Sequence, residues 1–232
     1  MKYKHAMFPC IMSGLSFLCF LFLMFDMASA VQPLWDKTMV LILPSLVLAL
    51  VGFFAYKGKL SARTTDSLTI ALSIILVIAS FLYTIFLSVW TATTVTTDIK
   101  FYPRAYAQID EEDGVTGIFP ATIPVDAENI AFRYNPQFLQ GGEWFELSYT
   151  TTAEVLSDWD SLLQDRAEWV GSYAEWRENH GGGGVQHEDA LLYQLYWEDE
   201  THGEAAYANH GETAYVLIDR TQNQITFFYE DW

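Results

Sequence analysis

The chain has 232 residues, of which 51% are hydrophobic, 29 are acidic and 12 are basic, and its formal net charge at pH 7 is −17. These figures average two unlike parts, because all but three of the acidic residues follow residue 97 whereas the basic residues divide evenly around it. A strongly negative surface is repelled by nucleic-acid phosphates and by anionic lipid headgroups. The composition therefore argues against nucleic acid as a partner, and against a lipid-binding surface in the C-terminal part.

Three apolar segments without any ionisable residue follow one another near the N-terminus, at residues 6–25, 39–56 and 68–90. Each has about 18 to 23 residues, which at a rise of about 1.5 Å per helical residue matches a hydrocarbon core roughly 30 Å thick. Inside a bilayer the backbone must satisfy its own hydrogen bonds, so each segment is expected to be helical. Residues 1–96 are therefore predicted to form three transmembrane helices that have the lipid bilayer as their partner.

The orientation follows from the basic residues that flank the apolar segments, because positively charged flanks stay in the cytoplasm. Such residues lie before the first segment and between the second and third, at Lys2, Lys4, Lys57, Lys59 and Arg63. The N-terminus is therefore predicted to be cytoplasmic, and the third helix should carry residues 97–232 to the outside. The expected localisation is the cell membrane, in a multi-pass protein with an acidic extracytoplasmic domain.

The first apolar segment has a second interpretation. Together with the N-terminal lysines and the sequence Ala28-Ser29-Ala30, it also describes a signal peptide with a cleavage site. Cleavage would leave a two-helix hairpin without changing the side on which the C-terminal domain lies. Both cysteines, Cys10 and Cys19, fall in this segment, so the outer domain has no disulfide. The absence of Asn-x-Ser/Thr sequons fits a bacterial envelope protein.

Hydroxyl side chains recur in the third apolar segment, at Thr69, Ser73, Ser80, Thr84 and Ser88. Spacing by four or seven residues places them on one stripe of a helix. One interpretation is a polar path for ions or protons, and the other is a close-packing seam between helices. The seam is favoured, because transport normally needs a carboxylate, a histidine or a lysine at depth and the segment has none.

The C-terminal part changes to short segments in which apolar and polar residues alternate. Residues 130–134 and 145–149 show the period of two that is typical of half-buried strands, and the loop between them contains Asn, Pro and Gly. Three more strands are predicted at residues 190–197, 213–219 and 224–229, the last two joined by a turn short enough for a hairpin. The pattern does not predict the order of the strands in the sheet.

Thr151 and Glu154 have the spacing of a capping box, which predicts the start of a helix. Apolar residues continue at helical spacing through Val170 to Tyr173, and Asp160 is among the acidic residues expected to face water. A glycine-rich stretch at residues 179–184 ends this helix. Residues 97–232 are therefore predicted to form a soluble α+β domain with an antiparallel sheet and one main helix.

A near-repeat late in the chain places His202, Glu204, His210 and Glu212 close together in the sequence. Imidazole and carboxylate groups are the ligands that zinc and related metals prefer. The spacing matches no established zinc motif, and the glycines in both copies equally indicate two similar turns in an exposed loop. An acidic cluster at residues 110–113 likewise allows either calcium binding or a solvated loop.

The outer domain has no cysteine and no Gly-x-Ser-x-Gly elbow, so no catalytic residue is assigned. Phe138 and Leu139 lie in a predicted loop, where they either contact a partner or fold back on the core. The favoured hypothesis is a membrane-anchored protein without a cofactor, whose extracytoplasmic domain binds a partner: an envelope or membrane protein, another envelope component or a small molecule. One alternative is a membrane-anchored hydrolase that depends on a divalent metal. Another is an accessory subunit of a larger membrane complex.

Overall fold

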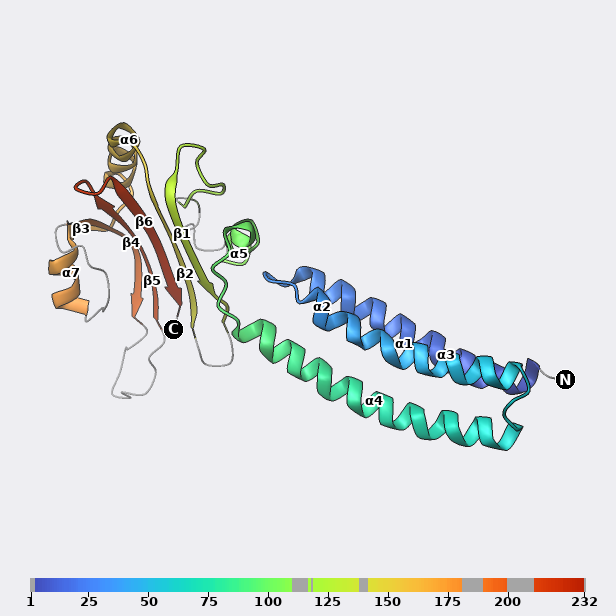
Figure 1. Ribbon diagram of the computed structural model, residues 1–232. Coiled ribbons are helices and arrows are strands. Elements are labelled where there is room, and N and C mark those ends of the chain that lie inside the picture. The colour runs from blue at the N-terminus through green and yellow to red at the C-terminus, as the bar shows by residue number, and fades with distance from the viewer. Residues whose placement is uncertain are drawn as a thin grey trace, which may run out of the picture. The chain divides into compact units, whose positions relative to one another are not determined.

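The computed structural model describes residues 3–109, 117, 119–137, 142–180, 190–199 and 211–231. The chain divides into two compact units, Met1–Ala92 and Thr93–Trp232. The first unit is helical and the second is built around a β-sheet (Figure 1). The change of unit falls at the end of the last long helix, slightly before the boundary near residue 97 that the composition indicates.

The N-terminal unit contains three long helical runs. These are α1 (Tyr3–Ser29), a continuous run of α2 (Trp35–Thr38), η1 (Met39–Ile42) and α3 (Leu43–Tyr56), and finally α4 (Ala62–Thr93). By length and composition, the helices over His5–Ser29, Trp35–Tyr56 and Ala62–Thr93 are long and apolar enough to cross a membrane. The three predicted apolar helices are thus confirmed, and each extends past its apolar segment into polar flanking residues.

Helices α1 and α3 are held together by small side chains. The Ser13 hydroxyl donates to the Ser45 carbonyl at 2.9 Å, and the Ser45 hydroxyl donates to the Ser13 carbonyl at 3.1 Å. Farther along, a Cβ atom at Gly52 would lie 2.9 Å from the Cys10 sulfur, so glycine lets the two helices approach closely. Small residues of this kind replace the hydrophobic driving force that is missing between helices in lipid.

Helix α4 contacts the other two helices through an apolar cluster of Leu87, Phe20 and Leu41. On its hydroxyl stripe, Thr69 and Ser73 are buried. The Thr69 hydroxyl donates back to a carbonyl of its own helix at 2.7 Å. Burial of Thr69 and Ser73 favours the packing-seam interpretation for this part of the stripe, whereas Ser80 and Thr84 line an apolar groove.

The C-terminal unit contains a six-stranded antiparallel sheet in the order β1-β2-β6-β5-β4-β3. In that order the strands are Glu128–Asn135, Glu143–Thr150, Gln224–Asp231, Gly211–Asp219, Leu191–Asp199 and Trp169–Ser172. The five predicted strands are confirmed, as are the two predicted hairpins. Strand β3 was not expected, because it falls where the sequence predicts a helix.

One face of the sheet, the core face, is fully apolar at its centre. Strand register brings Phe132, Leu147 and Phe227 side by side on it. Helix α6 (Ala153–Gln164) packs on this face, where the Trp159 ring meets the Phe227 ring at 5.1 Å. The short helix α5 (Tyr102–Tyr106) covers the other end, with the Tyr102 ring 5.5 Å from that of Phe132. This layer of aromatic rings is the main core of the unit.

The opposite side, called the second face from here on, is covered over β3, β4 and β5 by helix α7 (Tyr173–His180). The Trp169 indole of β3 packs against this cluster and lies directly over Gly171, where an added Cβ would come within 2.3 Å of the ring. The members of the cluster are Tyr173, Trp176, Ala190, Leu192, Tyr215 and Leu217.

The predicted single helix through Tyr173 is therefore wrong: the helix stops at Gln164 and β3 begins at Trp169. Pairing with β4 replaces helical hydrogen bonds, and the Glu168 N–H already donates to the Gln194 carbonyl at 2.8 Å. The spacing of Val170 and Tyr173 matches a helical period only by coincidence. Val170 belongs to a four-residue strand, and Tyr173 is the first residue of the next helix.

The helix cap also differs from the prediction by one residue. The Thr152 side chain, not that of Thr151, accepts a hydrogen bond from the Val155 N–H at 3.3 Å. The Thr151 hydroxyl donates instead to the Asp126 carboxylate at 2.9 Å. The Thr151 hydroxyl is engaged by Asp126, which precedes β1, so the neighbouring Thr152 caps the helix.

The chain that follows α4 joins the edge of the sheet. Thr96 and Tyr134 of β1 exchange two backbone hydrogen bonds, each 2.8 Å long. Near its start, β1 has a bulge in which Asn129 adopts a positive φ of 50°. One edge of the sheet is thus partly paired and partly bent.

Two adjacent leucines of α6 provide a test of this packing. Leu163 is 0% exposed and Leu162 is 41% exposed. Leu163→Ala is expected to lower the free energy of unfolding of the C-terminal unit by about 2–5 kcal/mol, because it leaves a cavity under the helix. Leu162→Ala should change it by less than about 1 kcal/mol. Denaturant titration of the full chain, followed by tryptophan fluorescence, measures both, and equal losses would contradict the packing described.

Candidate functional site

Most of the site residues predicted from the sequence lie outside the residues that the structure describes. His202, Glu204, His210, Phe138 and Leu139 lie outside the described residues, as does the acidic cluster at 110–113. Only the backbone of Glu212 is described, in β5 opposite Asp231. In the part of the chain that the structure describes, no three His, Cys, Asp or Glu side chains gather closely enough to hold a metal ion. The metal site and the partner-binding loop stay predictions.

The helical unit contains an apolar groove of about 620 Å³ between α1, α3 and α4. Its wall includes Leu15 and Phe20 of α1, Leu48 of α3, and Ser73 and Phe81 of α4. Its lining contains the Cys19 thiol but no acidic, basic or histidine side chain. Its chemistry therefore mainly matches the packing of apolar chains or helices.

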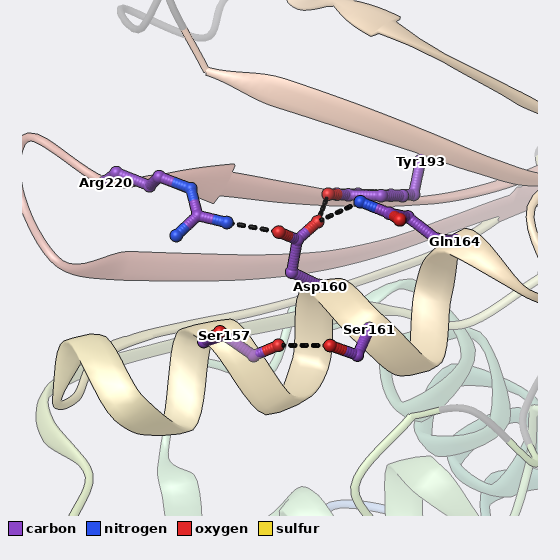
Figure 2. Close-up of polar contacts among 6 residues, drawn as sticks. All are labelled: Ser157, Asp160, Ser161, Gln164, Tyr193 and Arg220. Carbon is purple, nitrogen blue, oxygen red and sulfur yellow. Dashed lines mark hydrogen bonds and ion pairs between the residues drawn. The ribbon is translucent and has the colours of Figure 1, made fainter.

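A polar cluster joins α6 to the sheet (Figure 2). One carboxylate oxygen of Asp160 accepts hydrogen bonds from the Tyr193 hydroxyl of β4 and from the Gln164 amide. The other oxygen accepts from the Arg220 guanidinium, which also forms an ion pair with it. The Asp160 side chain is only 17% exposed. The prediction that Asp160 faces water is wrong, because the turn between β5 and β6 presents an arginine beneath this side of α6.

The turn that carries Arg220 is itself fixed by hydrogen bonds. The Asp219 carboxylate accepts from the Thr221 N–H at 2.8 Å and from the Gln222 N–H at 3.1 Å. Asn223 closes the turn with a positive φ of 51°, a conformation that asparagine tolerates well. Because Tyr193 of β4 and Arg220 of the β5–β6 turn both donate to Asp160, the cluster acts as a clamp that joins α6 to the sheet. A carboxylate with its acceptor positions filled in this way is poorly suited to act as a base.

A different group of side chains gathers on the second face, over β1, β2, β6 and β5. We call it the second-face patch, and it comprises Arg133, Trp144, Glu146, Thr213, Phe228 and Glu230. Register aligns these side chains in two rows: Arg133, Glu146 and Phe228 in one row, and Trp144, Glu230 and Thr213 in the other. Neighbouring strands thus bring together residues that are up to about a hundred positions apart in the chain.

Aromatic contacts hold the patch in place. The Trp144 and Phe228 ring centroids lie 6.0 Å apart, and Phe228 stacks on Tyr215 at 4.6 Å. The Arg133 guanidinium lies 3.9 Å from the centre of the Trp144 ring, which is a cation–π contact. The Trp144 and Phe228 rings are half-buried, so they are both fixed and accessible.

The two carboxylates of the patch lie in an unfavourable environment. Burial raises the pKa of Glu146, while the positive charge of Arg133 opposes that rise. Burial alone raises the pKa of Glu230. Among the described residues, neither carboxylate accepts a hydrogen bond. For both groups, burial therefore makes the charged form less favourable than it is in water.

Two more polar atoms of the patch lack partners. The Trp144 indole nitrogen and the Thr213 hydroxyl are buried, and neither has a hydrogen-bond partner within the described ranges. Thr213 is only 2% exposed. Buried polar atoms are nearly always hydrogen-bonded, so these two mark positions where a bound molecule can supply what the chain does not.

The alternation in the sequence already placed Arg133 and Glu146 on the polar side of their strands. It did not reveal the patch, because Phe228 and Glu230 join it only through the pairing of β2 with β6. No protein-family model, curated protein or solved structure matches this chain. Function has therefore to be inferred from the residues themselves.

The clamp at Asp160 can be tested by mutation. Asp160→Ala leaves the Tyr193 hydroxyl and the Arg220 guanidinium without their acceptor, and it should destabilise the C-terminal unit by about 1–3 kcal/mol. Asp160→Asn keeps one acceptor oxygen and should cost less. Asp158→Ala, at an exposed position of the same helix, is the matched control and should have little effect. Thermal unfolding compares the three, and a loss in Asp158→Ala equal to that in Asp160→Ala would refute the clamp.

The carboxylates of the patch should lower stability at neutral pH. A carboxyl group whose pKa is raised by folding stabilises the folded state while it is protonated, and this contribution is lost as the pH rises through the raised pKa. The double variant Glu146→Gln/Glu230→Gln should therefore unfold at a higher temperature than the native chain at neutral pH. The difference should shrink below the ordinary pKa of glutamate. Thermal unfolding across pH measures it, with the exposed pair Asp158→Asn/Glu168→Gln as control.

Proposed function

We propose that this chain is a membrane-anchored binding protein whose C-terminal unit holds a partner on its second face, outside the cytoplasm. Three helices that are long and apolar enough to cross a membrane support the anchoring. The basic flanks at Lys57, Lys59 and Arg63 support the orientation, because such flanks stay in the cytoplasm. The second unit supplies a folded sheet on which a partner can dock.

The observation that carries the binding role is the second-face patch. Folding alone would favour apolar or neutral residues at half-buried positions beside Phe228, since a buried charge without a partner is unfavourable. Glu146 and Glu230 nevertheless occupy these positions, next to an unpartnered indole N–H. Features that lower stability and pack no core gather at functional sites.

The patch supports binding better than catalysis. Its two carboxylates, the only side chains of the patch suited to act as a general acid or base, are accompanied by rings, one guanidinium and one hydroxyl, the groups typical of a docking surface. The hydrolase alternative depends on His202 and His210, which lie outside the described residues. A docking surface formed by rigid strands and half-buried aromatic rings requires none of those groups.

The orientation can be tested by cysteine labelling in intact cells. The background is the full chain with Cys10 and Cys19 changed to serine, into which Asp158→Cys or Lys59→Cys is introduced. A membrane-impermeant maleimide should label Asp158→Cys in intact cells and Lys59→Cys only after permeabilisation. The reverse pattern would place the C-terminal unit in the cytoplasm and would contradict the proposal.

The binding role is tested in the same cells by photo-crosslinking. A photoreactive amino acid at Ala131, an exposed second-face position of β1, should give a defined adduct on irradiation. The same group at exposed Leu162 of α6 is the control and should give none. Adducts at Ala131 should disappear in the Glu146→Gln/Glu230→Gln variant. Identical adducts at both positions, or none at either, would count against a binding site on the second face.

A further inference from the structure

The two glutamates of the patch are arranged to receive positive charge. Glu146 pairs with Phe228 and Glu230 pairs with Trp144, so the carboxylates occupy diagonal positions of neighbouring antiparallel strands. Residues in such positions lie roughly 7–8 Å apart. Phe228 lies beside both of them and provides an apolar floor for the stem of a long side chain.

The charges near the patch match a cationic ligand. Arg133 already lies over the Trp144 ring at 3.9 Å, which shows that a guanidinium is accommodated against this surface. One guanidinium leaves the pair of carboxylates with a net negative charge. All but three of the 29 acidic residues of the chain follow residue 97, and their combined field attracts cations to this unit.

The unpartnered donor distinguishes between classes of cation. The Trp144 indole N–H needs an acceptor, and within the described residues it has none. A metal ion or a polyamine carries no acceptor and would leave this donor unsatisfied. A peptide supplies backbone carbonyls at short intervals along with cationic side chains, so it offers groups for both the carboxylates and the indole.

We propose that the second-face patch binds a basic peptide segment of a partner protein. Glu146 and Glu230 receive its lysine or arginine side chains. The Trp144 N–H is buried in the free protein, and it donates to one of the backbone carbonyls of the peptide once binding has moved the side chains that cover it. The Thr213 hydroxyl, buried beside Glu230, completes the polar end of the site. This inference rests on the proposed function, because it names the partner class of the same site.

The test measures peptide binding to the full chain in nanodiscs of zwitterionic phosphatidylcholine. The probe is fluorescent hexalysine amide followed by anisotropy, with hexaglutamate and spermine as comparison ligands. Hexalysine should bind and hexaglutamate should not. Glu146→Gln/Glu230→Gln should weaken hexalysine binding by about tenfold or more, which corresponds to the loss of two charge-assisted contacts. Asp158→Asn/Glu168→Gln removes the same number of charges from an exposed region and should weaken it by about twofold or less.

A second variant examines the indole contact. Trp144→Phe keeps an aromatic ring but removes the N–H donor together with part of the ring surface under Arg133. It should weaken the binding of hexalysine more than that of spermine, because only the peptide offers a carbonyl to the indole N–H. The glutamine variants are expected to be more stable than the native chain, so unfolding does not explain a loss of binding, and thermal unfolding verifies this.

Three outcomes would overturn the inference. Equal losses in the two charge-removing pairs would show general acidic attraction, and spermine binding equal to that of hexalysine in every variant would show a polyamine site. Absence of hexalysine binding, with adducts still formed at Ala131 in cells, would leave the proposed function standing with a different partner class. Absence of both would remove the inference and the proposed function together.

Discussion

The C-terminal unit depends on one long-range pairing, the antiparallel register of β2 with β6. It aligns eight residue pairs, from Glu143 with Asp231 to Thr150 with Gln224. Because side chains alternate along a strand, this register sends Leu147 and Phe227 to the core face and leaves their neighbours on the second face. A slip by one residue would exchange the two sets and put carboxylates into the core. The core and the patch are therefore consequences of the same set of hydrogen bonds.

The local pattern of the sequence predicted those parts of the fold that local physics controls. The length of the apolar segments predicted the three helices, and the alternation of apolar and polar residues predicted five strands. Both patterns reflect which side chains of a segment are buried, whichever segment lies beside it. The order of the strands and the existence of β3 depend on partners far away in the chain. Trp169 and Gly171 look like weak helix residues until β4 lies beside them, and Asp160 looks solvent-exposed until Arg220 reaches it.

The candidate site was hidden for the same reason. Arg133 and Glu146 read as ordinary outward-facing residues, and only the pairing with β6 adds Glu230 beside them. The carboxylates of Asp160 and Glu230 differ in the hydrogen bonds that they accept. Asp160 accepts from three donors and holds α6 against the sheet, whereas the Glu230 carboxylate accepts from none among the described residues and burial raises its pKa. The same chemical group thus holds the structure together at Asp160, whereas at Glu230 it forms part of the binding surface that we propose.

The two outer edges of the sheet determine whether copies of the chain can pair with one another through their strands. Proteins held in a membrane diffuse in two dimensions and meet one another repeatedly in similar orientations, so an open strand would invite self-association. The exchange of hydrogen bonds between Thr96 and Tyr134, with the bulge at Asn129, takes up one edge. Strand β3 at the other edge has only four residues, too few for a stable added strand. Both edges of the sheet are therefore poor templates for pairing with a strand of a second copy.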